Sequence, residues 1–260
     1  MIFNRSTGQP GPMVAPVFTF KKLSDPTADA SYLYAEATDP VTGHVHFDLA
    51  LLESGTLTFT RVPARCRVFL QGGGDSGTNG SSSAAGTGGH GGRRLEQAVR
   101  IVPGVAYTVT VGAGEIPGTA SAEDSAAFGL SSASGSRVAY GGGTAENSAS
   151  RGQDGAVAFD GTSLIASLAG VKFGPGGGKG GIRNSYSSQS AAGNGGDDGG
   201  GKGGKGWEES DYRATEAGAA NRGAGSGGGR GDKLGMATGP RARGGSGIIL
   251  LRDDREEAAS

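Results

Sequence analysis

Short runs in which hydrophobic and polar residues alternate recur along this chain. Alternation with a period of two is the pattern of a β-strand with one buried face. Residues 248–251 (IILL) are apolar without alternation, which is typical of a strand buried on both faces. No stretch has a strong helical pattern, so we predict an all-β fold. The expected strands lie in residues 17–20, 32–34, 44–49, 56–60, 66–71, 107–111, 137–140 and 248–251.

A different pattern, with a period of three, fills the glycine-rich tracts. Two glycines precede another residue in 88–93 and 200–205, and in Gly177-Gly178-Lys179. A period of three matches the turn of a polyproline-II-type helix, which has no internal hydrogen bonds. Two faces of such a rod carry no side chains, and its N–H and C=O groups must bond to neighbouring rods. We therefore predict a packed bundle of polyglycine-II rods, with Lys179 and Lys202 keeping the rod edges soluble.

A flexible glycine-rich linker is the alternative interpretation of these tracts. However, strands run directly into glycine tracts at Gly72, Gly112 and Gly141, and the last tract leads directly into residue 248. A linker has no reason to adjoin strands so regularly, whereas extended and polyproline-II backbones differ only modestly in φ. The joins favour a β-sandwich whose strands continue into the rods.

Composition also indicates an unusual core. There are 54 glycines in 260 residues, whereas ordinary proteins contain about 7% glycine. The hydrophobic fraction of 35% is small for a conventional core. The net charge of −1 gives no general attraction to nucleic acid or to anionic membranes. Because Cys66 is the single cysteine, a disulfide framework within one chain is excluded, and we expect Cys66 to be a small core residue.

The order of the strand-to-glycine joins resembles that of a known family. The segments GTLTFT (55–60), CRVFLQGGG (66–74), PGVAYTVTVGAG (103–114), SRVAYGGG (136–143) and GGSGIILLR (244–252) are together similar to the glycine-rich domain of many phage tail and prophage proteins. The glycine-rich segment of the anaplastic lymphoma kinase receptor and the tail-fibre tip adhesins of T-even-like phages are similar too. The resemblance implies a polyglycine-II bundle and, for phage members, attachment to a host surface. It supplies no catalytic residues.

The change in composition along the chain predicts three parts. Residues 1–54 form an N-terminal attachment region, residues 55–252 the glycine-rich β/polyglycine-II domain, and residues 253–260 a charged C-terminal tail. The N-terminal residues lack the long apolar region of a secretory signal. No run approaches the roughly 20 apolar residues of a membrane span.

The interludes between the rods are expected to emerge as loops at the ends of the bundle. They span residues 182–192, 207–221 and 232–238, with 75–87 and 144–153 earlier in the chain. Aromatic and arginine side chains on loops held by a rigid scaffold suit recognition of sugars or protein surfaces. Alternatively, the aromatic side chains pack against the end of the bundle and seal it. The candidate receptor-binding residues are Arg183, Tyr186, Trp207, Tyr212, Arg213 and Met236.

No metal, cofactor or catalytic site is predicted. His44 and His46 are weak metal candidates, since they lie two residues apart on an expected strand and point to one face. In a trimer six such imidazoles would gather near the axis, but one HxH motif is weak support for coordination. Histidines that face the solvent are the simpler interpretation. The chain also lacks a Walker motif and any nucleophile–base pattern, so no enzyme activity is expected.

The leading hypothesis for function is a phage or prophage tail fibre or receptor-binding protein that adheres to a host-surface glycan or protein. Its N-terminal region would contact other virion proteins, and a homotrimer stays an open alternative. Such a protein is assembled in the host cytoplasm and located in the virion tail, which agrees with the lack of an export signal. The alternative hypothesis is a purely structural virion protein, a spacer or connector with no receptor of its own. Neither involves nucleic acid or insertion into a membrane.

Overall fold

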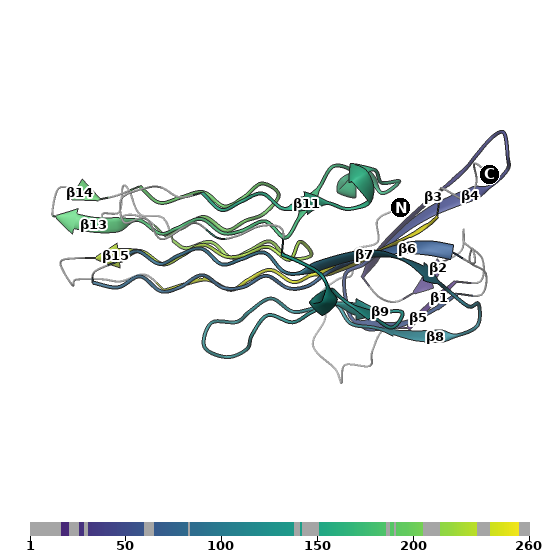
Figure 1. The fold of residues 1–260 in the computed structure, drawn as a ribbon, viewed down its shortest axis with the longest axis horizontal. Helices are drawn as coiled ribbons and strands as arrows, with labels where there is room; N and C mark the ends of the chain where they lie inside the picture. The colour runs from purple at the N-terminus through teal and green to yellow at the C-terminus, as the bar shows by residue number, and fades with distance from the viewer. Residues whose placement is uncertain are drawn as a thin grey trace.

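The computed structural model describes residues 17–20, 26–28, 31–59, 65–82, 84–137, 141, 151–185, 188–189, 191–204, 214–232 and 240–254. In this part of the chain, the two largest β-sheets form one end of an elongated molecule, and glycine-rich rods extend from them to the other end (Figure 1). The all-β prediction is confirmed, because the described elements are strands apart from three short 3₁₀ turns. These turns are η1 (Ser132–Ser134), η2 (Phe159–Gly161) and η3 (Ala166–Leu168).

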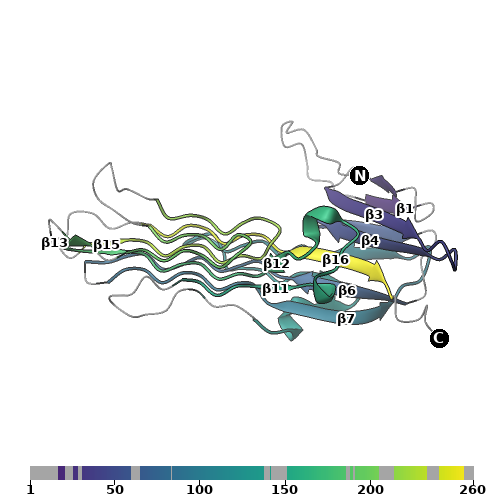
Figure 2. The same cartoon turned by 90° about the horizontal axis from the view of Figure 1, so that it is seen from above.

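A five-stranded sheet joins the rods to the rest of the molecule. Its order is β3-β4-β16-β6-β7, and every neighbouring pair is antiparallel. Figure 2 shows β16, β6 and β7 lying in line with the rods, with the β16 arrow directed away from them. The strands are β3 (Tyr32–Thr38), β4 (Val45–Leu51), β16 (Ile248–Asp253), β6 (Arg65–Gln71) and β7 (Arg94–Arg100).

A four-stranded sheet packs against one face of this sheet. Its order is β2-β1-β5-β8, in which β1 and β5 are parallel and the other pairs antiparallel. Its strands are β1 (Val17–Phe20), β2 (Pro26–Ala28), β5 (Gly55–Phe59) and β8 (Ala106–Val109). The remaining strands form small sheets: β9 (Ala126–Ala127), β10 (Leu130–Ser131), β11 (Ala156–Val157), β12 (Lys172–Phe173), β13 (Ile182–Ser185), β14 (Ser188–Gln189) and β15 (Gly231–Asp232).

Strand β16 is buried on both faces, as its unbroken apolar run predicts. Ile249 and Leu251 lie in the core between the two large sheets. Ile248 and Leu250 lie in a second core on the opposite face, under residues 156–173. The two large sheets therefore form a β-sandwich with β16 at the centre of one of them. The core between the sheets also contains Phe47, Leu49, Leu51, Leu57, Phe59, Val68, Leu70 and Val109.

The N-terminal strands belong to the same sandwich. Strand β4 pairs with β16, so that Leu49 lies opposite Leu251, and β1 pairs with β5. A boundary at residue 54 therefore does not separate one sheet from another. Whether residues 1–54 attach the protein to a particle stays a prediction, because these contacts concern folding alone.

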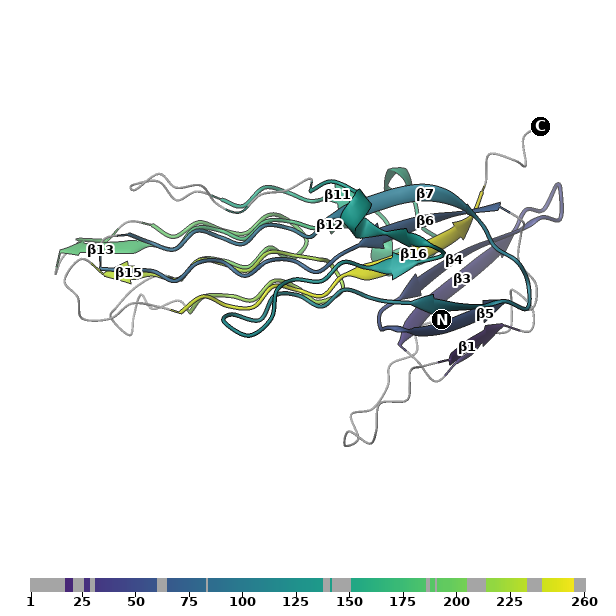
Figure 3. The same ribbon diagram turned by 60° about the horizontal axis from the view of Figure 1, so that its bottom comes forward.

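Beyond the sandwich, extended segments lie side by side, and we call them rods (Figure 3). Their described ranges are 72–80, 86–93, 174–181, 191–196, 200–204, 214–219, 223–230 and 241–247. Hydrogen bonds between rods repeat every three residues. Between an antiparallel pair, N–H groups donate to carbonyl oxygens at 2.7–2.8 Å from Gly86 to Gly229, Gly89 to Ser226 and Gly92 to Gly223. Between a parallel pair they donate at 2.8–2.9 Å from Gly225 to Pro175, Gly228 to Gly178 and Gly231 to Gly181.

This period of three is the one expected of rods with a three-residue turn. Because the rods approach at backbone distance, most of the glycines between them leave no room for a side chain. A Cβ on Gly77, for example, would lie 2.5 Å from the carbonyl oxygen of Gly227 and 2.6 Å from that of Thr87. Such distances are shorter than any real contact of a Cβ atom. The bundle is therefore packed through its backbone.

Two sequence expectations about the rods are wrong. Most of residues 75–87, expected to be a loop, belongs to two adjacent rods, namely residues 75–80 and 86–87, and the Ser81 N–H donates to the Ala84 carbonyl oxygen between them. The glycines there, at positions 74, 77 and 80, recur singly every three residues, so a search for paired glycines misses them. Lys179, expected at a soluble edge, is only 4% exposed. Lys202 does lie at the surface, 3.7 Å from Glu216.

Two glycines of one rod provide a test of backbone packing. A Cβ on Gly201 would lie far inside van der Waals contact with the Glu216 carbonyl oxygen and 2.7 Å from Gly227 N. We expect Gly201→Ala to destabilise the fold by about 3 kcal/mol, since backbone atoms cannot move aside cheaply. For a domain of this size that lowers the melting temperature by about 6–12 °C. Thermal unfolding followed by circular dichroism measures the change.

Gly204→Ala is the matched control. The nearest atom to its Cβ would be the Thr215 hydroxyl oxygen at 2.8 Å, which can rotate away, and the next would be Arg230 N at 3.4 Å. The loss is therefore expected to stay near about 1 kcal/mol, the net value of one hydrogen bond. Equal melting temperatures for the two variants would contradict packing through the backbone.

Candidate functional site

The end of the bundle farthest from the sandwich is closed by a small sheet of β14, β13 and β15 (Figure 1). Strands β13 and β14 form an antiparallel hairpin in which Arg183 lies opposite Gln189. Strands β13 and β15 are parallel, with Arg183 opposite Asp232. The Asp232 N–H donates to the Ser81 carbonyl oxygen at 3.0 Å, and Asp232 is 2% exposed. Backbone pairing thus links three separate parts of the chain at this end.

The described residues that flank three of the predicted loops also lie together here. Parts of the predicted loops have another structure, since residues 182–185 and 188–189 are strands and residues 214–219 form a rod. Residues 186–187, 205–213 and 233–239 lie outside the described part of the structure. The Gly181 N–H donates to the Gly204 carbonyl oxygen at 2.9 Å, and the Gly231 N–H donates to that of Gly181 at 2.9 Å. On the return side, the Thr215 hydroxyl donates to the Pro240 carbonyl oxygen at 2.9 Å. The described residues on either side of these segments therefore lie on neighbouring rods.

Of the predicted receptor-binding residues, only the backbone of Arg183 is described, in β13. Its side chain is outside the described part of the structure. The other five also fall outside the described residues, so their role in binding stays a prediction. They are Tyr186, Trp207, Tyr212, Arg213 and Met236.

A second candidate is an open recess of about 530 Å³ where the sandwich meets the rods. Leu33 and Leu52 line it from the sandwich, and Asp198, Asn221 and Arg222 line it from turns between rods. Asp198 and Asn221 have φ angles of 61° and 55°, conformations that aspartate and asparagine tolerate better than most residues. The recess joins residues from well-separated segments, so no local sequence pattern indicates it.

The polar groups of this recess are already engaged by the protein. The Asp198 carboxylate accepts a hydrogen bond of 2.8 Å from Lys172 N, and Arg222 Nη1 donates to the Asn221 carbonyl oxygen at 3.2 Å. The Arg222 guanidinium also lies 5.6 Å above the Phe173 ring, and burial lowers the pKa of Arg222. These contacts shape the turn, and the recess presents no convergent set of groups that specifies a ligand.

A network of charged side chains lies beside the recess. Lys172 Nζ is 2.9 Å from Asp154 and 3.2 Å from Asp197, and Arg151 contacts the same two carboxylates at 2.6 and 2.5 Å. Hydrogen bonds to the Asp154 carboxylate hold its pKa below the usual value; the largest effect comes from the Asp197 N–H, and smaller ones come from Lys172 and Arg151. Two positive and two negative groups balance, so the network offers no surplus charge for an ionic ligand.

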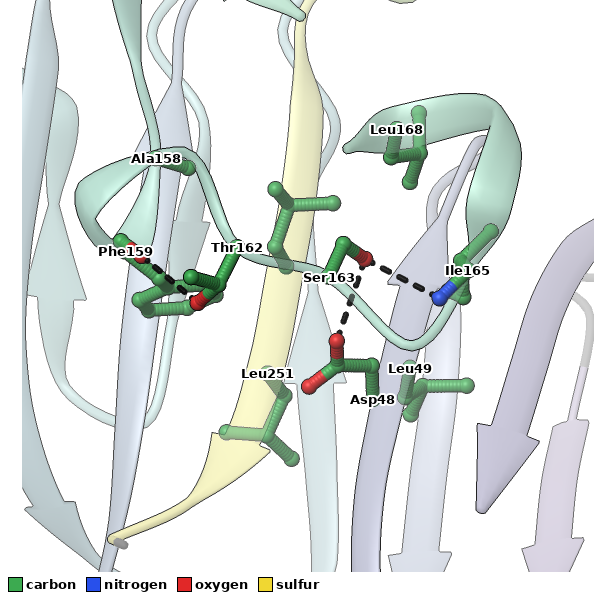
Figure 4. A pocket seen from close by; sticks show the side chains of 10 residues that line it. Asp48, Leu49, Ala158, Phe159, Thr162, Ser163, Ile165, Leu168 and Leu251 are labelled. Carbon is green, nitrogen blue, oxygen red and sulfur yellow. Dashed lines mark hydrogen bonds between the residues drawn. The ribbon is translucent and has the colours of Figure 1, made fainter. Parts of the chain in front are cut away.

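A small cavity in the second core is lined by Asp48, which forms a buried ion pair beside it. Figure 4 shows the Asp48 carboxylate next to the Ser163 hydroxyl at this cavity. The cavity volume of about 10 Å³ holds one water molecule at most. Arg252 Nη2 donates to Asp48 at 2.8 Å, and each residue is 4% exposed. Asp48 also accepts hydrogen bonds from the Ser163 hydroxyl at 3.0 Å and from Leu164 N at 2.6 Å. These hydrogen bonds, with those from Arg252 to Thr162, hold residues 162–164 against the sheet. The cavity is too small for a substrate.

The two weak metal candidates lie at the opposite end of the molecule from the loops, beside the β3–β4 turn. The side chain of His44 is 42% exposed and that of His46 is 20% exposed. The interpretation of solvent-facing histidines thus fits His44 better than His46.

Comparison with protein families gives one finding. The family model described as "Glycine-rich domain" matches residues 52–253 of this chain. The match includes the strands β5, β6, β7, β8 and β16 together with the rods. No curated protein matches the chain. Within the described residues, no helix is both long enough and apolar enough to cross a membrane.

The buried Asp48–Arg252 ion pair provides a test of which interactions stabilise the second core. Arg252→Met leaves the Asp48 carboxylate buried without its charged partner, a change that typically costs about 3–5 kcal/mol. We expect the melting temperature to fall by about 6–20 °C. Arg67→Met is the control on the neighbouring strand, because the Arg67–Glu96 pair is partly exposed, at 31% and 25%.

An exposed pair contributes at most about 1 kcal/mol, so Arg67→Met should change the melting temperature by a few degrees only. In the double variant Asp48→Leu with Arg252→Met, much of the loss should be recovered, since no buried charge remains. Equal melting temperatures for Arg252→Met and Arg67→Met would contradict a stabilising role of the buried ion pair.

Proposed function

The chain belongs to the glycine-rich domain family, and from this premise we propose that it is a phage or prophage tail fibre or receptor-binding protein. In this function the loops at the end of the rod bundle adhere to the surface of a host cell. The proposal extends the family assignment with the order of strand-to-glycine joins, which resembles that of phage tail proteins. The protein acts by binding and not as an enzyme.

One observation carries the proposal. Segments that flank three loops meet at the end of a bundle whose rods are joined by backbone hydrogen bonds, including those from Gly181 to Gly204 and from Gly231 to Gly181. Loops that start on a rigid scaffold keep their relative positions, which lowers the entropy cost of binding. The arrangement therefore suits recognition by residues that are far apart in the sequence.

The composition of these loops suits adhesion. They include Trp207, Tyr212 and Arg213, which are the residue types that contribute most to binding at protein surfaces. The partner is a host-surface glycan or protein. Single contacts of this kind are weak, but several copies on one particle strengthen attachment by avidity. A homotrimer would supply such copies, with three sets of loops.

The opposite end of the molecule is available for attachment to the particle. The sandwich lies there, and the β3–β4 hairpin projects away from the rods (Figure 1). We propose that the N-terminal region, residues 1–54, contacts other virion proteins. The protein is then located in the virion tail, after assembly in the host cytoplasm.

The competing proposal is a structural virion protein, a spacer or connector without a receptor. The elongated bundle favours it as well, because rods joined by backbone hydrogen bonds form a stiff spacer. The two proposals differ in one measurable property, the binding of the isolated chain to cells.

Binding of the purified, fluorescently labelled chain to cells of the host species is measured by flow cytometry. We expect saturable binding that falls by at least about tenfold in the variant Trp207→Ala with Tyr212→Ala, since such anchors typically contribute more than about 1 kcal/mol each. The control variant is Val105→Ala with Ile116→Ala, which also truncates exposed hydrophobic residues, 43% and 46% exposed, away from the loops.

The melting temperature of each variant is measured as well, to check that the fold is retained. Absence of binding to every strain that the source particle infects would reject the adhesin and favour the spacer. Equal binding by the loop variant and the control variant would reject the assignment of the loops.

A further inference from the structure

The turn between β3 and β4 holds two imidazoles in fixed positions. Asp39 Oδ1 accepts hydrogen bonds from the N–H groups of Val41 at 2.7 Å and Thr42 at 3.2 Å. Gly43, with a φ of 68°, completes the turn, and its N–H donates to the Asp39 carbonyl oxygen at 2.8 Å. His44 and His46 follow directly, and their rings lie with centroids 4.7 Å apart.

Asp253 faces these two rings from the neighbouring strand. It is the last residue of β16, and its Oδ1 accepts a hydrogen bond of 3.0 Å from the Phe47 N–H. Its Oδ2 lies 2.5 Å from His46 Nδ1 and 3.6 Å from His44 Nε2. The three potential ligand atoms lie within 4.8 Å of one another. The Phe47 N–H thus orients the carboxylate so that its second oxygen points at the imidazoles.

The charge of Asp253 has no fixed positive partner among the described residues. Its side chain is 1% exposed, and its ion pairs there are those with His44 and His46. The nearby arginines are paired elsewhere, Arg252 with Asp48 and Arg65 with Asp254. A carboxylate removed from water needs a compensating positive charge. A bound cation would supply that charge.

We propose that His44, His46 and Asp253 bind a divalent transition-metal ion, with zinc as the first candidate. Two imidazole nitrogens and one carboxylate oxygen are ligands typical of zinc and its neighbours, whereas calcium and magnesium require oxygen ligands. In a tetrahedral zinc site with bonds of about 2.0–2.1 Å, ligand atoms lie about 3.3 Å apart. Among the three atoms, the 3.6 Å pair already fits, and His46 and Asp253, now 2.5 Å apart, need to separate by only about 1 Å.

The ion would act as a clasp at the end of the sandwich away from the rods. It would join the β3–β4 hairpin to the end of β16, the central strand of the five-stranded sheet. The fourth ligand position is open to water, because His44 is 42% exposed. This site is complete within one chain and does not depend on a trimer or on the proposed receptor binding.

Chelator-treated full-length protein is titrated with zinc ions in a calorimeter. We expect one zinc ion per chain. We also expect a rise in melting temperature of about 5–10 °C at a zinc concentration about 100 times the Kd. Cobalt(II) in place of zinc should give the visible absorption of a tetrahedral site with mixed nitrogen and oxygen ligands. Calcium, which prefers oxygen ligands, should bind at least about 100-fold more weakly.

His44→Ala and Asp253→Asn should each weaken zinc binding by more than about 100-fold, because even changes to groups behind a metal ligand cost about 10–100-fold. His90→Ala is the control, since His90 is the remaining histidine and lies beside Asp75 instead. His44 is half-exposed, so His44→Ala should retain the fold even if Asp253→Asn does not.

Four outcomes would overturn the proposal, and three of them concern binding strength. The first is the absence of saturable binding at about 100 µM zinc, a concentration far above the Kd of structural zinc sites in proteins. The second is unchanged binding by His44→Ala, and the third is equal losses for His90→Ala and His44→Ala. A ratio of one zinc ion per three chains, with Asp253→Asn unaffected, would indicate a histidine site between chains and reject the clasp.

Discussion

The structure depends on hydrogen bonds between backbones that approach each other without intervening side chains. Contacts such as Gly89 to Ser226 and Gly225 to Pro175 repeat every three residues, and they need bare faces on both rods. Ordering glycine is entropically costly, so a single rod would not persist. Packing several rods satisfies most amide groups at once and replaces the hydrophobic core that the composition lacks. The interior of this half of the molecule is therefore polar backbone.

The sandwich supplies what the rods lack, namely a defined starting register. Strands β6 and β16 pair with Ile248 opposite Gln71, and both are directly continuous with glycine tracts. A repetitive rod can slide by three residues against its neighbour and regain the same contacts. A sheet whose side chains alternate between two cores cannot slide without exposing them. Hydrophobic packing around β16 thus fixes the positions at which the rods begin.

The strands could be predicted because their signal is local. The apolar run 248–251 and the alternation in 56–60 each specify which faces are buried. The rod residues 75–80 escape prediction because glycines spaced singly leave a mixed tract that looks like a loop. The partnership of His46 with Asp253 could not be predicted, since it depends on the pairing of β4 with β16 across most of the chain. Likewise, the residues that flank the candidate loops are brought together only by contacts between rods. The spacing of residues along the sequence does not reveal these contacts.

The position of β16 in the sheet has a consequence for biosynthesis. Its neighbours β4 and β6 leave the ribosome first, and at translation speeds of about 5–20 residues per second they wait on the order of 10–40 s for their central partner. During that time two apolar strand edges and a long series of unpaired glycine amides stay in contact with water or with other chains. Folding then requires closure of very long loops in one late step, which makes it slow. Nascent chains of this design are accordingly vulnerable to misassembly on crowded polysomes and would gain from a chaperone that shields those edges until termination.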